Sequence, residues 1–180
     1  MNVKGLVGLA ILGGFLSATA STAAMQAGKK DAPAKKPAAA PAKKADAGAK
    51  KADGGTTVEL TGDDTMKYNL SALTAKPGQE IHLKLTNKGT MPKIAAAHNF
   101  VLLKKGTDMN AFTTAAVMAV QTDYIPPKFK EQVIASTKLA GPGETVETTF
   151  KAPTVPGTYD FICSFPGHFA TMKGTLTVAK

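Results

Sequence analysis

Short runs of alternating apolar and polar residues, separated by turn residues, fill the chain from residue 56 onward. The runs lie near residues 57–60, 66–70, 80–86, 99–104, 146–150, 158–163 and 175–178. Alternation places every second side chain on the same face of a strand, and the intervening Gly, Pro and Asn residues are typical of turns. About 125 residues are enough to build a two-sheet core. We therefore predict an all-β fold, a β-sandwich, for residues 56–180.

One stretch, residues 107–121, breaks the alternation and is typical of a helix. Asp108 precedes an apolar, alanine-rich run from Met109 to Met118. An aspartate at this place accepts a hydrogen bond from a backbone N–H of the first helical turn. The pattern therefore predicts a short helical insertion within the sandwich.

The candidate chemistry lies between residues 163 and 172, where the single cysteine Cys163 is followed by His168 and Met172. Cysteine and methionine sulfur select Cu(I), and imidazole suits copper well. A trigonal set of two His and one Cys, with a distant axial Met, is the pattern of blue-copper electron-transfer sites. His98 is the candidate for the second histidine.

The spacing suits a loop between two strands. Residues 159–163 and 173–178 are both predicted strands, so all three donors hang from one hairpin. Pro166 and Gly167 form a turn dipeptide that lets the chain fold His168 back toward the Cys163 sulfur. The hairpin therefore brings a thiolate, an imidazole and a thioether together.

Each residue also has a simpler interpretation. Cys163 alone suits a buried inert thiol or an intermolecular disulfide, and Met172 or His98 alone suits a core or surface position. Their combination at this spacing favours the copper site. His82 alternates onto the polar side of a predicted strand, so we expect a solvated surface residue there.

Residues 163–172 resemble the copper loop of azurins, within the cupredoxin family. Residues 98–102 resemble the upstream ligand segment of azurins, residues 85–93 the stretch leading into it, and residues 134–144 the segment before the penultimate strands. The resemblance covers residues 56–180. It implies a cupredoxin-like Greek-key β-sandwich, with a helical insertion where residues 107–121 stand.

The resemblance also implies a ligand set for one type 1 copper. His98, Cys163 and His168 would form the equatorial plane, and Met172 the weak axial contact. The backbone carbonyl of Ala97 would be a second axial oxygen, at a position where azurins have glycine.

Two further residues of the resemblance surround the ligands. Asn99 would brace the two ligand loops, and the backbone N–H groups of Asn99 and Phe165 would donate to the thiolate. Such outer bonds orient ligands and tune the metal. The chain departs from azurins in having no second cysteine for their disulfide and no tryptophan.

By this resemblance the protein is a monomeric electron carrier without enzymatic activity, exchanging electrons with c-type cytochromes or with terminal reductases and oxidases. His168 would break the surface within an apolar patch that serves short-lived docking. The patch would comprise Met91, Pro92, Ala96, Phe165, Pro166, Phe169 and Ala170. The alternative is a copper-binding or delivery protein with the same ligands, which the lack of a Met- and His-rich tract disfavours.

Residues 1–24 are typical of a signal peptide. Lys4 precedes an apolar run over residues 5–16 and a small-residue cleavage site at residues 18–20, and cleavage there or after Ala24 would release the protein into the periplasm. The run is short for a membrane span. Retention as an uncleaved anchor is the alternative.

Residues 25–55 are built mainly of Ala, Lys, Pro, Gly and Asp, so we predict a disordered tether. Eight lysines against three aspartates there supply most of the chain's net charge of +9. The chain has no arginine, which disfavours bidentate recognition of nucleic acid. The tether is either a solvated spacer or a weak attachment to membrane or cell wall.

Overall fold

The computed structural model describes residues 50–52 and 55–180, with side chains from residue 55 onward. The predicted signal peptide, residues 1–24, and all but a few residues of the predicted tether, residues 25–55, lie outside the described residues. Among the described residues, no helix is both long and apolar enough to cross a membrane.

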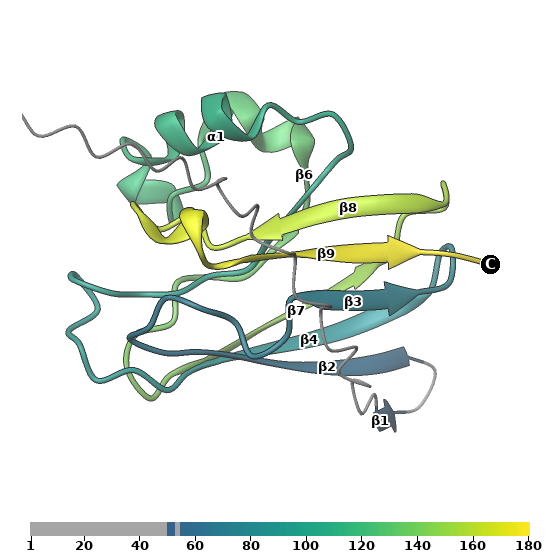
Figure 1. The fold of residues 1–180 in the computed structure, drawn as a ribbon, viewed down its shortest axis with the longest axis horizontal. Coiled ribbons are helices and arrows are strands. Elements are labelled where there is room, and N and C mark those ends of the chain that lie inside the picture. The colour runs from purple at the N-terminus through teal and green to yellow at the C-terminus, as the bar shows by residue number, and fades with distance from the viewer. Residues whose placement is uncertain (1–49, 53–54) are drawn as a thin grey trace, which may run out of the picture. The chain divides into compact units, whose positions relative to one another are not determined.

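Two β-sheets make up the fold (Figure 1). One sheet has the order β1-β2-β4-β7, with strands β1 (Lys50–Ala52), β2 (Gly55–Gly62), β4 (Glu80–Asn87) and β7 (Thr145–Lys151). The other has the order β3-β9-β8-β5-β6, with β3 (Ala72–Ala75), β9 (Lys173–Val178), β8 (Gly157–Ile162), β5 (Val101–Leu103) and β6 (Val133–Ser136).

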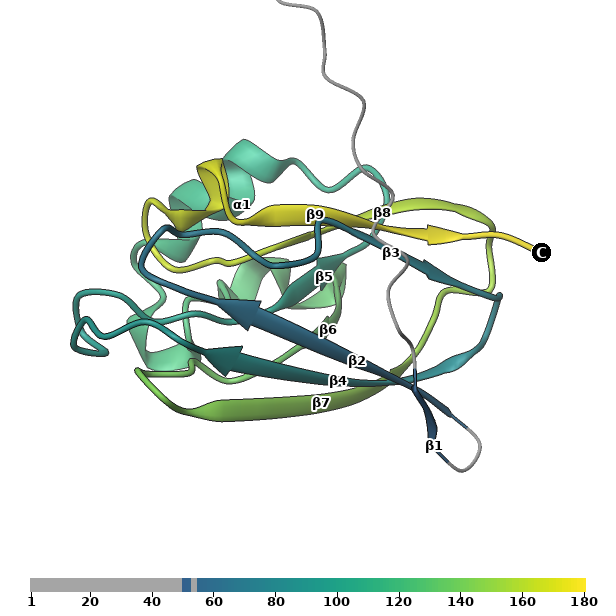
Figure 2. The same cartoon turned by 60° about the horizontal axis from the view of Figure 1, so that its bottom comes forward.

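The chain passes repeatedly between the sheets, because β3, β5 and β6 lie in the second sheet while β2, β4 and β7 lie in the first (Figure 2). Strand pairs β2–β4 and β3–β9 are parallel, and the other pairs are antiparallel. The predicted all-β sandwich with a short helical piece is confirmed.

Alternation along each strand builds the core between the sheets. On β4, Ile81, Leu83 and Leu85 are buried while Lys84 is exposed. Each buried aliphatic side chain of this size contributes about 1.5–3 kcal/mol. The rings of Phe100 and Phe161 meet in the same core with centroids 5.2 Å apart.

Helix α1 (Met109–Ala116) begins as the sequence predicts. The Asp108 side chain accepts a hydrogen bond from the Ala111 N–H at 3.0 Å. Phe112 and Ala116 pack in a second cluster with Val101 and Ile162. Those strand residues point away from the sheet–sheet core, so α1 covers the outer face of the five-stranded sheet, as Figure 1 shows. Two 3-10 turns follow, η1 (Val120–Thr122) and η2 (Pro127–Gln132).

Some strand predictions are wrong. Residues 66–70 are not a strand but part of the β2–β3 loop, with one bridge between Gly62 and Tyr68 and a left-handed Met66 at φ 55°. Strands β3 and β6 were missed because four residues carry too little alternation to stand out.

Three connections gather at one end of the sandwich: β2–β3, β4–β5 and β8–β9 (Figure 1). Side-chain bonds tie them together. The Asp64 carboxylate accepts the Thr90 N–H at 2.9 Å, and the Thr171 hydroxyl donates to the Met66 carbonyl at 2.8 Å. The candidate ligands lie among these connections.

Candidate metal centre

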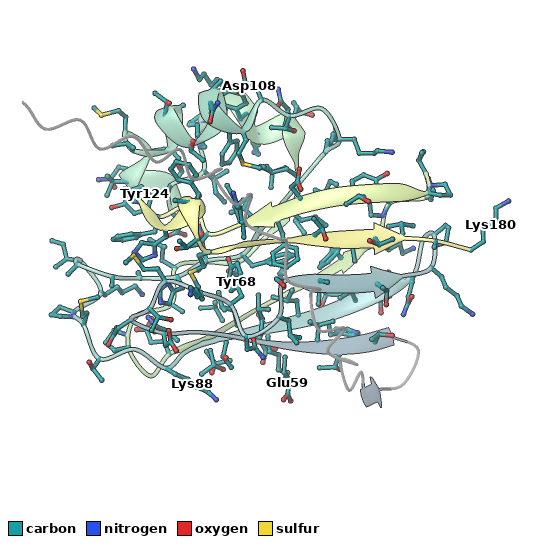
Figure 3. All side chains as sticks on the ribbon, viewed as in Figure 1. Glu59, Tyr68, Lys88, Asp108, Tyr124 and Lys180 are labelled. Atoms are coloured by element: carbon teal, nitrogen blue, oxygen red, sulfur yellow. The ribbon has the colours of Figure 1, made fainter. Side chains whose placement is uncertain are left out.

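His98, Cys163 and His168 form one buried cluster, with their candidate ligand atoms all within 4.8 Å of one another. His98 precedes β5, whereas Cys163 and His168 belong to the β8–β9 connection. Figure 3 shows the side chains, with the labelled Tyr124 beside this connection, where its ring meets the Phe165 ring at 5.1 Å. The structure thus brings together the three residues that the sequence singles out.

The backbone of His98 is held on both sides although it lies outside any strand. Its N–H donates to the Ala140 carbonyl at 3.1 Å, and its carbonyl accepts the Ala140 N–H at 2.7 Å. The Asn87 side chain also donates to the Ala140 carbonyl, at 3.0 Å. The imidazole therefore leaves an anchored backbone.

The β8–β9 connection is closed by its own backbone bonds. The Cys163 N–H donates to the Met172 carbonyl at 2.9 Å, and the Met172 N–H donates to the His168 carbonyl at 2.7 Å. Gly167 takes a left-handed φ of 82°, which glycine adopts without steric cost, just before the 3-10 turn η3 (His168–Ala170). The turn brings His168 Nδ1 to 3.7 Å from Cys163 Sγ.

The Asn99 side chain links the two ligand segments. Its Oδ1 accepts the Ser164 N–H at 2.8 Å, and its Nδ2 donates to Ser164 Oγ at 2.9 Å. Nδ2 also donates to the Asp123 carbonyl at 2.8 Å. The backbone N–H groups of Asn99 and Phe165 lie close to the Cys163 sulfur, where they oppose the rise in its pKa that burial causes. Both residues thus lie beside the candidate ligand Cys163.

Met172 and Ala97 lie beside the cluster. A Cβ added to Gly62 would come within 2.4 Å of the Met172 methyl carbon and 2.9 Å of the His98 ring, so both side chains lie against this glycine. The Ala97 carbonyl oxygen is 3.8 Å from Cys163 Sγ. Sequence reasoning missed Gly62; the only signal was a glycine closing a strand that ends at the site.

Burial controls the charge of the donors. It raises the pKa of Cys163 to about 12, and the two backbone N–H groups oppose this only in part. Burial also lowers the pKa of His168 to about 4, with a smaller contribution from the neighbouring His98, whose own pKa is lowered by burial. At neutral pH both imidazoles are therefore uncharged, with lone pairs free to bind a metal.

His98 gives a test of whether a metal fits. Both of its ring nitrogens are buried without a hydrogen-bond partner. The Asp63 backbone lies near enough to oppose the fall in the His98 pKa, but its contact does not reach hydrogen-bond geometry. An unpartnered buried polar group costs about 1–3 kcal/mol, which a bound metal would offset. Two neutral imidazoles, a thiol and a thioether in a dry site suit copper.

The surface above His168 differs from the prediction. Only 3% of His168 is exposed, and Ala96 and Phe165 are buried. The remaining predicted patch residues reach the surface: Met91, Pro92 and Ala170 are exposed, and Pro166 and Phe169 are half-buried. Ile94, which sequence reasoning did not include, is 92% exposed in the same connection as Met91. The His168 ring is therefore almost wholly buried, with the Phe165 ring centroid 4.7 Å from its own.

His82 lies on β4, as predicted, and takes no part in the cluster. Its Nδ1 is 2.9 Å from the Thr149 hydroxyl, and its Nε2 is 3.4 Å from the Glu80 carboxylate.

A family model for copper binding proteins of the plastocyanin/azurin family matches residues 55–179. The chain belongs to this family. Over 125 residues, this cupredoxin is 36% identical to azurin of Pseudomonas aeruginosa, covering 68% of this chain and 84% of that protein. It is 38% identical over 124 residues to "Outer membrane protein H.8" of Neisseria meningitidis serogroup B, covering 68% of this chain and 66% of that protein.

Among solved structures, the reduced auracyanin of Roseiflexus castenholzii matches this cupredoxin with a TM-score of 0.61 and 36% identity, over 69% of this chain and 97% of that chain. The predicted resemblance to azurins is confirmed, and copper is the cofactor of the family. Membership also confirms that the protein is not an enzyme.

Proposed function

We propose that this cupredoxin is an exported single-electron carrier whose copper ligands are His98, Cys163, His168 and Met172. The observation that carries the proposal is the buried cluster of two neutral imidazoles and one cysteine sulfur. The Ala97 carbonyl oxygen, 3.8 Å from the Cys163 sulfur, would be a further oxygen donor at the site. When bound, copper supplies a Cu(I)/Cu(II) couple that takes up and releases one electron.

Rigid ligands support this function. The Ala140 bridge holds His98, and the Cys163–Met172 and Met172–His168 backbone bonds hold the loop. Ligands held by their surroundings rearrange little when the charge at the site changes. A carrier therefore needs only small nuclear motion for each transfer.

Burial and the neighbouring backbone N–H groups control the protonation of Cys163. The Cys163 thiol, with a pKa raised to about 12, keeps its proton at neutral pH, and a metal that binds the sulfur would displace this proton to solvent. The N–H groups of Asn99 and Phe165 then stabilise the thiolate. Burial of Cys163 and Met172 keeps water from the sulfur donors.

The surface over His168 is the proposed docking face. Exposed Met91, Pro92 and Ala170 and half-buried Phe169 provide an apolar face for partners. Small apolar faces favour short encounters, which suits a carrier that must leave after each transfer. The proposed partners are c-type cytochromes and terminal reductases or oxidases, and the proposed state is a monomer.

Export is proposed from residues 1–24, which are typical of a signal peptide. One relative bears the name of an outer membrane protein, which agrees with export. The lysine-rich residues 25–55 are proposed to act as a spacer with weak attraction to anionic surfaces.

The test is a visible absorption spectrum of residues 25–180 after addition of Cu(II), then of ascorbate, then of an oxidant. We expect an intense blue band that bleaches on reduction and returns on oxidation. The Cys163→Ser variant should lack this band, because the band arises from the thiolate. Copper bound to the parent protein without the blue band would overturn the carrier and favour copper delivery.

A further inference from the structure

Residues 98–100 carry a ligand, and their backbone groups face two directions. The His98 N–H and carbonyl form hydrogen bonds with the carbonyl and N–H of Ala140. The Phe100 N–H donates to the Thr137 hydroxyl at 3.0 Å, and its carbonyl accepts the Thr137 N–H at 3.0 Å. His98 and Phe100 are therefore tied to the segment that follows β6.

Asn99, between them, faces the other way. Its N–H lies near the Cys163 sulfur, and its carbonyl accepts a hydrogen bond from the Tyr68 hydroxyl. Among the described residues, Tyr68 is the hydrogen-bond donor to this carbonyl. Tyr68 thus holds the Asn99 carbonyl, and the N–H of the same residue faces the Cys163 sulfur.

Tyr68 is itself firmly placed. Tyr68 forms a β-bridge with Gly62. The N–H of the neighbouring Asn69 donates to the Thr61 carbonyl at 3.0 Å, and the Asn69 Oδ1 accepts the Thr61 N–H at 2.6 Å. The Tyr68 ring is buried and meets the Phe161 ring with centroids 5.6 Å apart. Burial raises the pKa of Tyr68 well above its ordinary value, so the hydroxyl keeps its proton and acts as a donor.

From this arrangement we propose that Tyr68 is a positioning residue for the copper site, whose hydroxyl holds Asn99 so that the Asn99 N–H points at the Cys163 sulfur. The inference rests on the proposed electron-carrier function. Hydrogen bonding around the cysteine sulfur tunes the potential of blue-copper sites. A donor that withdraws charge from the thiolate favours the reduced form, so Tyr68 raises the potential through Asn99.

The test compares Tyr68→Phe with Tyr159→Phe. Phenylalanine keeps the ring at position 68 and removes only the hydroxyl. Tyr159 is an apt control because it is also buried, and its hydroxyl also donates to a backbone carbonyl, that of Val155 at 2.7 Å, but it lies on β8 away from the ligands. Both variants therefore lose one hydroxyl-to-carbonyl bond.

For Tyr68→Phe we expect a lower reduction potential and a blue band at longer wavelength. At a fixed solution potential, the ratio of oxidised to reduced protein should rise about threefold, the size expected for one weakened hydrogen bond. In the metal-free protein, the Asn99 amide should exchange its hydrogen faster, as NMR measures. Tyr159→Phe should change neither property.

A Tyr68→Phe protein that loses stability but keeps the parent potential, band and Asn99 exchange would overturn the proposal and leave Tyr68 a core residue. If this variant does not fold, 3-fluorotyrosine at position 68 replaces it, because it keeps the ring and makes the hydroxyl a stronger donor. It should then raise the potential, and an unchanged potential would count against the proposal. Failure of the proposed function would show separately, as a parent protein without the blue band.

Discussion

Gly62 shows how an absent side chain shapes the metal centre. The Met172 methyl and the His98 ring both occupy the space that a Cβ would take. The residue closes β2, so strand and site meet at this point. The close approach of two candidate ligands thus depends on glycine.

We predict that Gly62→Ala will displace Met172 and His98. Overpacking of a dense site costs about 1–3 kcal/mol, so copper affinity should fall by about tenfold or more. Competition with a chelator measures the affinity. Gly55→Ala is the control, because Gly55 lies at the other end of β2 and its added methyl meets the His82 ring, which takes no part in the cluster. Equal affinities for the two variants would contradict the role of Gly62.

We predict that Met172→Gln will keep copper bound and shift both the potential and the spectrum. The axial ligand tunes the potential of blue-copper sites, whereas the two histidines and the cysteine hold the ion. Replacing the thioether by an amide oxygen should lower the potential, because a harder ligand favours Cu(II). Voltammetry and absorption spectra check this, and loss of copper altogether would argue against an axial Met172.

At the scale of elements, the helical insertion packs beside the metal centre but supplies none of the candidate ligands. Helix α1 covers the outer face of the five-stranded sheet through Phe112 and Ala116. The candidate ligands sit instead among the connections at one end of the sandwich. Stability of the helix and chemistry of the site should therefore respond to different substitutions.

Asp108→Ala removes the cap of α1, and we expect the free energy of unfolding to fall by about 1 kcal/mol. Asp108→Asn should retain most of the stability, since asparagine also caps helices. Denaturant titration measures both variants. The blue band should stay unchanged in each, and a shifted band would mean that α1 helps to hold the ligands.

Strands of six residues or more were predictable, because each contains a run of alternation. Strands β4, β7, β8 and β9 show that pattern, and the Asp108 cap marked the start of α1. The four-residue strands β3 and β6 did not stand out. Alternation also gave a wrong prediction at residues 66–70. Tyr68 is buried there as in a strand, but its segment is a loop that forms a single bridge and no ladder of strand hydrogen bonds. A short pattern does not distinguish these cases.

At the scale of the whole molecule, charge is unevenly distributed. Residues 56–180 carry thirteen lysines against ten acidic residues, whereas residues 25–55 carry eight lysines against three. The excess positive charge is thus concentrated before the cupredoxin fold. Attraction to anionic surfaces is expected to belong to that segment.

Deletion of residues 25–49 should leave the band and potential unchanged, because it spares β1 and the candidate ligands lie between residues 97 and 172. Binding to vesicles of anionic lipid at low salt should weaken on deletion and in the parent protein at high salt. Co-sedimentation with vesicles measures this. Equal binding with and without the segment would place the attraction on the cupredoxin domain instead.

The sequence by itself determined the donor types, their loop and the layered fold, because alternation and ligand spacing are local properties of the chain. The ligand pattern offered His98 as the second histidine, but no local property of the chain brings it to Cys163, which lies 65 positions further along the sequence. Only the tertiary structure decided the space at Gly62, the burial of His168 and the bond from Tyr68 to Asn99. These contacts join segments far apart in the chain, and they depend on how the sheets and connections pack.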